Sequence, residues 1–287
     1  MTDSLPFISV IIPTYRDWNR LTICLKALKK QDYPQASFEI IVVNNEPADK
    51  MPDGYWKPDN CIIIDESKPG SYSARNAALR LAKGEIYAFT DSDCIPDAAW
   101  LSNAVKFFIQ NTDITRIAGN IKLFYKKEKL TAAELYEKVY AFKQKISAAD
   151  GVSVTGNMFA QKSVFNLIGS FNENLLSGGD FEWSKRAEAA GSKIRFVENV
   201  VILHPARHQM AELYKKEIRR AGWIGNNRKA AIKRLFKYSI PPVKTLFHGE
   251  DMNLAEKVRV FFIRYNLNFI RSIEEIKISF GKKPNRE

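Results

Sequence analysis

The stretch Glu85–Asp97 reads EIYAFTDSDCIPD, and the expected fold is built around it. Its short apolar run Ile86–Phe89 predicts a buried strand that ends in two carboxylates, Asp91 and Asp93. Residues at i and i+2 on an extended segment point to the same side, so the two negative charges favour a shared cation. A hard divalent ion suits such oxygen ligands and commonly partners phosphates. Acid pairs after strands also act as turn or cap residues, so the motif alone leaves both interpretations open.

Three more apolar runs, each closed by polar or helix-breaking residues, predict further strands at Phe7–Ile12, Phe38–Val43 and Cys61–Ile64. Helical patterns separate the strands, so we expect an α/β fold with a mostly parallel, doubly wound, Rossmann-like sheet flanked by helices. Ligands bind outside the carboxyl ends of such strands, so the polar residues there should meet at one edge. Those ends carry Pro13, Thr14 and Tyr15, then Asn44, Asn45 and Glu46, then the Gly70–Asn76 loop and helix start, and finally Asp91, Ser92 and Asp93.

Apolar periodicity and capping residues predict the remaining elements of the first 207 residues. The first expected helix begins after Asp17, which can cap it, and the second runs over Ala74–Ala82 with Ser71 or Ser73 as cap. Further helices are expected over Trp100–Ile109, Ala132–Ala149 and from Asp180 through Ala190. The expected strands are Arg116–Phe124 and Lys193–Leu203. Because Asp180 lies at or near the start of its helix, capping is the structural alternative to any chemical role for it.

The positive charge is concentrated after Pro205. The chain carries a formal net charge of +12, and residues 205–287 contain 19 Lys and Arg against 8 Asp and Glu, which is +11. This part predicts helices at Tyr214–Arg220, Asn227–Tyr238 and Ala255–Ile276. The last of these has an apolar stripe of Val260, Phe261, Phe262, Tyr265, Phe269 and Ile273 flanked by Arg259, Arg264 and Arg271. Such a helix could lie on an anionic membrane surface, or it could pack on its own domain.

The three cysteines, Cys24, Cys61 and Cys94, are odd in number and widely spaced, which fits a reducing compartment. Cys94 beside the acid pair invites a nucleophile or metal-ligand interpretation, but a buried cysteine serving as a small apolar residue is commoner. The chain shows neither a signal-peptide pattern nor an apolar run of about eighteen residues. We therefore expect a cytoplasmic protein.

Seven segments occur in the order typical of the family 2 inverting glycosyltransferases with the GT-A fold, which the chain resembles. They are ISVIIPTYR at 8–16, FEIIVVNNE at 38–46, GSYSARNAAL at 70–79, AFTDSDCIPDAAWL at 88–101, VTGNMFAQKSVFNLIGSF at 154–171, GGDFEWSKRAEAAG at 178–191 and ILHPAR at 202–207. The resemblance implies a catalytic domain over residues 1–207, with a nucleotide-binding half to about 97 and an acceptor-binding half from about 98. Residues 208–287 match the family much less distinctly and are expected to form a basic helical extension.

The resemblance implies a nucleotide-sugar donor, Mg²⁺ or Mn²⁺, and inversion at the anomeric carbon. It places Pro13, Thr14 and Tyr15 beside the base and ribose. Asn44, Asn45 and Glu46 occupy the site where the family usually has one or two acids contacting the base. The two asparagines depart from the family's pattern, so the identity of the nucleotide base is not determined. Each amide still offers a donor and an acceptor to a pyrimidine, and a UDP-sugar is expected.

The remaining site residues follow from the same resemblance. Gly70 and Arg75 match residues near the diphosphate and donor sugar; Asp91, Ser92 and Asp93 match the D-x-D motif, with Asp93 as direct metal ligand and Asp91 on ribose or on the ion through water; His204 matches an additional metal ligand; Asn157 and Trp183 match residues near donor sugar and acceptor. Asp180 matches the general base of the G-E-D or G-G-D motif, in which Gly179 here replaces the glutamate.

The chemistry agrees with these residue types. A single displacement needs one base on the acceptor hydroxyl and an ion that offsets charge on the leaving diphosphate. Two other classes compete. One is a nucleotidyltransferase or phosphotransferase on a similar sheet, but the chain lacks a Gly-Lys-Ser/Thr phosphate loop and this class does not explain GGDFEW. The other is a nucleic-acid binder using the basic tail. A degenerate member that binds donor without transfer is a third. The intact acids favour transfer.

The expected partners and location follow from this interpretation. We expect a glycan or lipid-linked acceptor in surface polysaccharide synthesis, and no nucleic acid. Residues 208–287 are expected to contact an anionic membrane, which would place a peripheral enzyme at its inner face.

Overall fold

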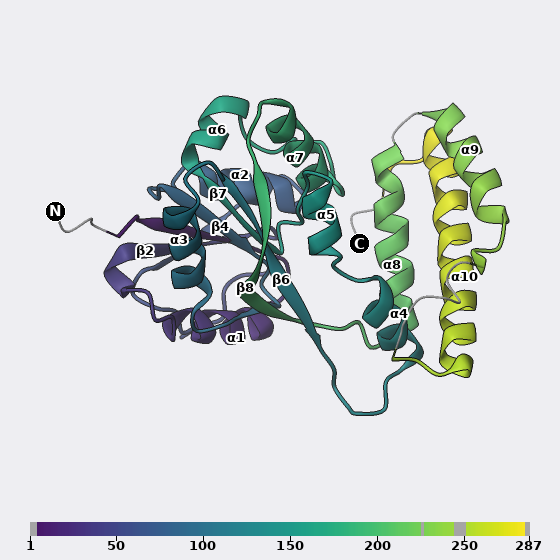
Figure 1. Ribbon diagram of the computed structural model, residues 1–287, viewed down its shortest axis with the longest axis horizontal. Coiled ribbons are helices and arrows are strands. Elements are labelled where there is room, and N and C mark those ends of the chain that lie inside the picture. The colour runs from purple at the N-terminus through teal and green to yellow at the C-terminus, as the bar shows by residue number, and fades with distance from the viewer. Residues whose placement is uncertain (1–4, 225–226, 244–250, 285–287) are drawn as a thin grey trace. The chain divides into compact units, whose positions relative to one another are not determined.

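The computed structural model describes residues 5–224, 227–243 and 251–284; residues 225–226, 244–250 and 285–287 of the expected extension lie outside the described residues. The chain divides into two compact units. Unit 1 comprises Met1–Lys122, Phe142–Asn174 and Gly179–His204, and unit 2 comprises Leu123–Ala141, Leu175–Gly178 and Pro205–Glu287. Unit 1 contains most of an eight-stranded sheet in the order β3-β2-β1-β4-β7-β6-β8-β5 (Figure 1).

The first half of the sheet is parallel. β1 (Ile8–Thr14), β2 (Phe38–Asn44), β3 (Cys61–Asp65) and β4 (Ile86–Thr90) confirm all four strands expected around the acid pair. β1 pairs in parallel with both β2 and β4, and β2 with β3. Their β-branched runs are buried because helices cover both faces of the sheet.

The second half of the sheet introduces antiparallel pairing. β7 (Asn157–Gln161) pairs with β4 and with β6 (Arg116–Phe124), while β8 (Ile194–Pro205) pairs with β5 (Ile95–Pro96). The expected α/β class is confirmed, and the sheet is mixed because β7 enters it between β4 and β6. The sequence left Asn157–Gln161 without an assignment, since five mostly apolar residues carry no decisive period.

Helices cover the two faces with different apolar sets. α1 (Trp18–Lys29) and α3 (Trp100–Gln110) pack on the face that includes Ile8, Val10 and Ile12. On the other face, aromatic contacts join Tyr72 of α2 (Ser71–Leu79), Phe165 of α6 (Lys162–Ile168) and Trp183 of α7 (Gly179–Ala189) to Phe89 and Phe171. Short 3₁₀ turns lie at Gln35–Ser37 and Gly222–Ile224.

Two expectations about helices are wrong. The helix expected over Ala132–Ala149 is split into α4 (Ala132–Tyr140) and α5 (Gln144–Ala149), because Phe142 takes a positive φ of 46° and packs its ring on His204 at 4.5 Å between centroids. A non-glycine residue rarely adopts this conformation, and periodicity alone gives no sign of it.

The expected caps also differ. Asp17 precedes α1, but its carboxylate pairs with Arg20 at 2.8 Å instead of capping the helix. Gly70, with φ 118°, occupies the N-cap of α2, and Ser73 donates to the carbonyls of Lys68 and Gly70.

Unit 2 is helical, with α4, α8 (Met210–Ala221), α9 (Arg228–Ser239) and α10 (Leu254–Ser279). Its apolar core joins α4, α8 and α10. Part of the positive charge of unit 2 forms ion pairs with buried glutamates: Glu137 pairs with Arg207 at 2.7 Å and with Lys216 at 3.0 Å. Despite burial, these cations lower the pKa of Glu137 to about 2. None of the helices in the described ranges combines the length and apolar character needed to cross a bilayer.

Arg116 on β6 is a fully buried cation at the centre of a polar network. Its guanidinium donates to the carbonyl groups of Gly151, Ser184 and Ser192 and pairs with Glu188 at 3.0 Å. Burial lowers the pKa of Arg116, but an arginine remains charged at neutral pH. The network joins β6 to the loops around α5, α7 and β8.

Arg116→Met should lower the free energy of unfolding by about 3 to 5 kcal/mol, because three buried carbonyl groups lose their donor. Arg195→Met, which removes an exposed arginine from β8, is the matched control and should change it by less than about 0.5 kcal/mol. Urea unfolding of both variants measures this. Equal stability of the two would mean that the network contributes little.

Candidate active site

The carboxyl ends of the parallel strands bring the predicted polar residues to one edge of the sheet. Thr14 and Asn44 are direct partners in the β1–β2 register. Asp91, buried Ser92 and Asp93 follow β4, which neighbours β1. Gly70 starts α2 and donates its N–H to the side chain of Asn45 at 2.8 Å. The prediction that these segments meet at one edge is therefore confirmed.

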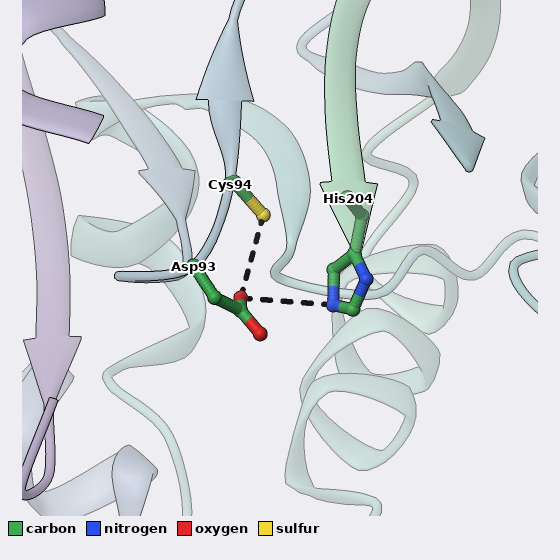
Figure 2. Close-up of side chains that lie close together, drawn as sticks. All are labelled: Asp93, Cys94 and His204. Atoms are coloured by element: carbon green, nitrogen blue, oxygen red, sulfur yellow. Dashed lines mark hydrogen bonds and ion pairs between the residues drawn. The ribbon is translucent and has the colours of Figure 1, made fainter. Parts of the chain in front are cut away.

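Asp93 and His204 lie together although they are far apart in sequence (Figure 2). The β5–β8 pairing of Ile95 with Leu203 brings them close, and Nε2 of His204 lies 3.6 Å from Oδ1 of Asp93. Sγ of Cys94 is 3.9 Å from the same oxygen. The possible ligand atoms of these three residues lie within 4.8 Å of one another, which is the spacing a bound ion requires.

The chemistry of this group suits a hard or borderline divalent ion. Carboxylate and imidazole together can hold Mn²⁺. Burial, followed by the charges of Asp91 and Asp93, raises the pKa of the Cys94 thiol well above its ordinary value, so the thiol is protonated and adds no charge. The guanidinium of Arg20 lies 3.4 Å from Oδ2 of Asp93, and it supplies part of the positive charge that the acids need.

Asp91 is held by a buried cation. Nη2 of Arg75 lies 2.5 Å from Oδ1 of Asp91, and the Arg75 side chain is only 3% exposed. Among the described residues, Nε of Arg75 and the hydroxyl of Thr14 are buried without a hydrogen-bond partner. Buried polar atoms usually have partners, so these two atoms fit a polar ligand at the edge of the sheet.

Asn44 and Asn45 serve the loops, which corrects the expectation that their amides offer a donor to a base. Both N–H groups of Asn44 donate within the chain, to the carbonyl of Asp49 and the carboxylate of Asp65. Both N–H groups of Asn45 donate to the carbonyls of Glu66 and Lys68. Neither amide has a donor left for a base. Glu46, next in the chain, pairs with Arg16 at 3.3 Å.

Asp180 is buried in the first turn of α7, one residue after the helix begins. Its Oδ1 accepts from the Tyr72 hydroxyl and from the N–H of Phe181, both at 3.0 Å, and its Oδ2 accepts from the N–H of Thr155 at 3.4 Å. Burial raises its pKa, and the nearby Arg75 opposes that shift. Because two of its three donors lie outside α7, helix capping does not account for its position.

The segment Thr155–Gly156 lies close to both Asp180 and Asp91. The N–H of Thr155 reaches Asp180, and a Cβ added to Gly156 would lie 3.3 Å from Oδ2 of Asp91. Asp91 and the later acid, Asp180, therefore both lie beside one dipeptide.

Asn157 and Trp183, expected near donor sugar and acceptor, are core residues in the structure. Asn157 is fully buried; its side chain accepts from the Trp100 indole at 2.9 Å and donates to the carbonyls of Asn120 and Val200. Trp183 is fully buried, stacks on Phe165 at 4.4 Å and donates to the carbonyl of Gly169. In this structure both side chains hydrogen-bond within the core, so a direct contact of either with a sugar is no longer expected.

Sequence reasoning missed Tyr72, Arg20 and Asp65. Tyr72 lies three residues before Arg75, so a helical wheel places the two on one face of α2. Arg20 is in the first turn after β1, and β1 neighbours β4, so the adjacency of the strands points to Asp93. Asp65 ends β3 in register with Asn44. Each signal exists in the sequence but becomes decisive only with the strand order.

The mixed sheet with paired acids at its carboxyl edge defines the GT-A class of glycosyltransferases. The family model described as Glycosyl transferase family 2 matches residues 9–164. The chain belongs to this family.

Known proteins give the same assignment. Glycosyltransferase AglE of Haloferax volcanii is 38% identical over 228 residues, which are 76% of this chain and 73% of AglE. A Methanococcus voltae enzyme named dolichyl N-acetyl-alpha-D-glucosaminyl phosphate 3-beta-D-2,3-diacetamido-2,3-dideoxy-beta-D-glucuronosyltransferase is 22% identical over 228 residues, 74% of this chain and 71% of that protein. The mannosyltransferase PcManGT from Pyrobaculum calidifontis, solved with GDP-Man and Mn²⁺, shares the fold with a TM-score of 0.58 and 17% identity, covering 98% of this chain and 78% of that one.

Proposed function

We propose that the protein is an inverting, metal-dependent glycosyltransferase in which Asp180 is the general base. The observation that carries this proposal is the placement of Asp180 and Asp91 beside the same dipeptide, Thr155–Gly156. A direct displacement needs a base on one side of the reacting carbon and charge compensation at the leaving group on the other. Family membership supports transfer over a nucleotidyltransferase or a nucleic-acid-binding function.

The chain's own residues supply the proton transfer. Asp180 takes the proton of the acceptor hydroxyl while that oxygen bonds to the anomeric carbon and the bond to the diphosphate oxygen breaks. The nucleoside diphosphate leaves, and the configuration inverts. The raised pKa of Asp180 brings it closer to neutral pH, where a carboxylate is a more effective base.

Asp93 and His204 would hold a Mg²⁺ or Mn²⁺ ion, with Asp91 nearby. Such an ion, when bound, offsets the negative charge that develops on the leaving diphosphate. Arg75 fixes Asp91 by a short ion pair and presents a buried N–H that has no partner among the described residues. These groups orient the donor and supply positive charge without taking part in proton transfer.

The donor is proposed to be a nucleotide sugar, with a UDP-sugar as the expected one. Pro13, Thr14 and Tyr15 at the end of β1 and Gly70 at the start of α2 lie at the edge where the fold class binds nucleotides. The acceptor is proposed to be a glycan or lipid-linked sugar in polysaccharide synthesis. The name of the Methanococcus relative, which includes a dolichyl phosphate sugar, supports a lipid-linked acceptor.

We also propose that residues 208–287 contact an anionic membrane at its inner face, as an extension of a catalytic domain that ends near residue 207. α10 has two apolar faces. Val260, Ile263, Leu267 and Ile278 are buried, whereas Leu254, Val258, Phe262, Phe269 and Ile273 are exposed and lie on the opposite side of the helix. The expected stripe is corrected accordingly: Val260 faces inward, and Arg271 is held by Glu217.

α9 repeats this arrangement with lysines. Ile232 and Phe236 are exposed four residues apart on α9, Phe236 is 71% exposed, and the exposed Ile240 follows the end of the helix. Lys229, Lys233 and Lys237 are exposed with the same spacing. Exposed aromatic and aliphatic side chains beside lysines are typical of helices that lie in a membrane interface.

Asp180→Asn keeps the size of the side chain but removes the base, so transfer should fall about 10²- to 10⁴-fold with donor affinity nearly unchanged. In the unchanged protein, the rate should fall as pH drops through the pKa of Asp180, and this acid limb should lie above that of an ordinary aspartate because burial raises the pKa. Initial rates against pH measure both. A folded Asp180→Asn protein with full activity would falsify the base role.

Asp93→Asn should weaken Mn²⁺ binding and reduce transfer strongly, because one of two direct ligands loses its charge. Calorimetric titration with Mn²⁺ measures the binding, and activity with and without a chelator measures the requirement. Asp113→Asn, at an exposed site paired with Lys193, is the control and should leave both unchanged. Equal turnover in chelator and in Mn²⁺ would refute metal dependence.

Phe236→Ser combined with Phe262→Ser should reduce co-sedimentation with anionic vesicles, since both exposed rings are lost from unit 2. Each basic residue near such a surface contributes about 1 kcal/mol, so binding should also fall with salt. Ile109→Ser, at an exposed apolar site on α3, is the control. A truncation near Tyr238 is unsuitable because α10 provides core residues of unit 2. Equal recovery with neutral and anionic vesicles would exclude this mode of attachment.

A further inference from the structure

The feature that the proposed mechanism leaves unexplained is the buried Tyr72–Asp180 pair. Tyr72 is the second residue of α2 and is 5% exposed. Its hydroxyl lies 3.0 Å from Oδ1 of Asp180, in a buried hydrogen bond between α2 and α7. A buried hydrogen bond to a charged group is among the stronger single contacts in a protein.

The direction of this hydrogen bond is fixed. Burial, and then the charge of Asp180, raises the pKa of Tyr72 far above its ordinary value, so the phenol keeps its proton. A protonated phenol facing a carboxylate can only donate to it. The bond therefore stabilises the ionised form of Asp180 and opposes the effect of burial.

Gly179 makes the contact possible. A Cβ added to Gly179 would lie 2.7 Å from Cε2 and 2.8 Å from Cδ2 of the Tyr72 ring, closer than such atoms approach. Gly179 does not have a positive φ, so its backbone would accept another residue and only the ring excludes a side chain there. Phe171 lies against the other part of the ring at 5.8 Å between centroids. Position 179, directly before Asp180, must therefore be glycine for the Tyr72 ring to occupy its place.

The two oxygens of Asp180 are not equivalent. Oδ1 accepts from Tyr72 and from the N–H of Phe181, both at 3.0 Å, which occupies its two lone pairs. Oδ2 accepts one longer bond, at 3.4 Å, from the N–H of Thr155. Among the described residues, Arg75 of α2 is the charged group that opposes the effect of burial on Asp180, and Arg75 in turn pairs with Asp91, which lies beside Gly156.

We propose that Tyr72 is a positioning residue: its hydroxyl, held over Gly179, binds Oδ1 of Asp180 and leaves Oδ2 as the oxygen that takes the acceptor proton. This inference rests on the proposed base role of Asp180. It adds a residue on α2, the helix that also carries Arg75. One helix, α2, therefore carries both the residue that positions the proposed base, Tyr72, and the buried cation that holds Asp91, Arg75.

Tyr72→Phe tests the proposal because it keeps the ring over Gly179 and removes only the hydroxyl. Loss of a hydrogen bond to the charged form should raise the pKa of Asp180 by about one to two units. Titration of protein labelled with ¹³C at the aspartate carboxyl carbon, with Asp180→Asn assigning the signal, measures this without any activity assay. The acid limb of the rate should move upward by the same amount, with the KM for the donor unchanged.

Tyr87→Phe is the matched control, since Tyr87 is a buried tyrosine on β4 in the same aromatic layer, 5.4 Å from Phe165. It should leave the Asp180 titration unchanged. If Tyr72→Phe does not fold, Gly179→Ala replaces it, because the added methyl group must displace the ring and should shift the midpoint in the same direction.

The outcomes separate the two proposals. An Asp180 midpoint that is the same in the folded Tyr72→Phe variant and in the unchanged protein overturns the role of Tyr72, even if Asp180→Asn is inactive. Full activity of Asp180→Asn removes the base role, and the carboxyl titration still decides whether Tyr72 controls Asp180. The proposal is also overturned if the titration midpoint of Asp180 rises in Tyr72→Phe while the acid limb of the pH–rate profile stays in place. In that case Asp180 would not be the group whose ionisation controls the rate.

Discussion

The structure of the site depends on the antiparallel pairing of β7 with β4. In this register Thr90, the last residue of β4, faces Asn157, the first of β7. The chain entering β7 therefore crosses the turn that leaves β4, and Thr155–Gly156 comes to lie beside Asp91. Asn157 secures this crossing through three hydrogen bonds to Trp100, Asn120 and Val200. Gly119 lies against the Asn157 side chain, where a Cβ would come within 2.4 Å of its amide atoms.

Charge compensation is the second constraint on the edge of the sheet. The three predicted acids each have a partner of their own: Arg75 and Tyr72, both on α2, contact Asp91 and Asp180, while Arg20 and His204 pair with Asp93. Carboxylates placed this close would otherwise raise one another's pKa. A neutral donor for Asp180 leaves it a better proton acceptor than a full ion pair would, because an adjacent cation lowers basicity more strongly.

The positive charge after Pro205 has two uses. Part of it neutralises buried glutamates within unit 2, as with Arg234 on Glu275 at 2.7 Å and Arg271 on Glu217 at 3.2 Å. The exposed lysines of α9 remain on the surface beside apolar side chains. A sequence count of charges cannot separate these groups, since both consist of basic residues at helical spacing.

The sequence by itself determined the four parallel strands, the edge where their polar ends meet and the family, because buried β-branched runs and the residues that end them are local signals. It also predicted Asp91, Asp93 and Asp180 as the acids of the site. Only the tertiary structure decided which neighbours those acids have. Asn157 and Trp183 proved to be core residues, Asn44 and Asn45 hold loops, and Tyr72 and Arg20 reach the acids. Hydrogen bonds between residues far apart in the chain depend on the strand order and on the strained turn at Phe142. Neither feature can be predicted from the periodicity of the sequence.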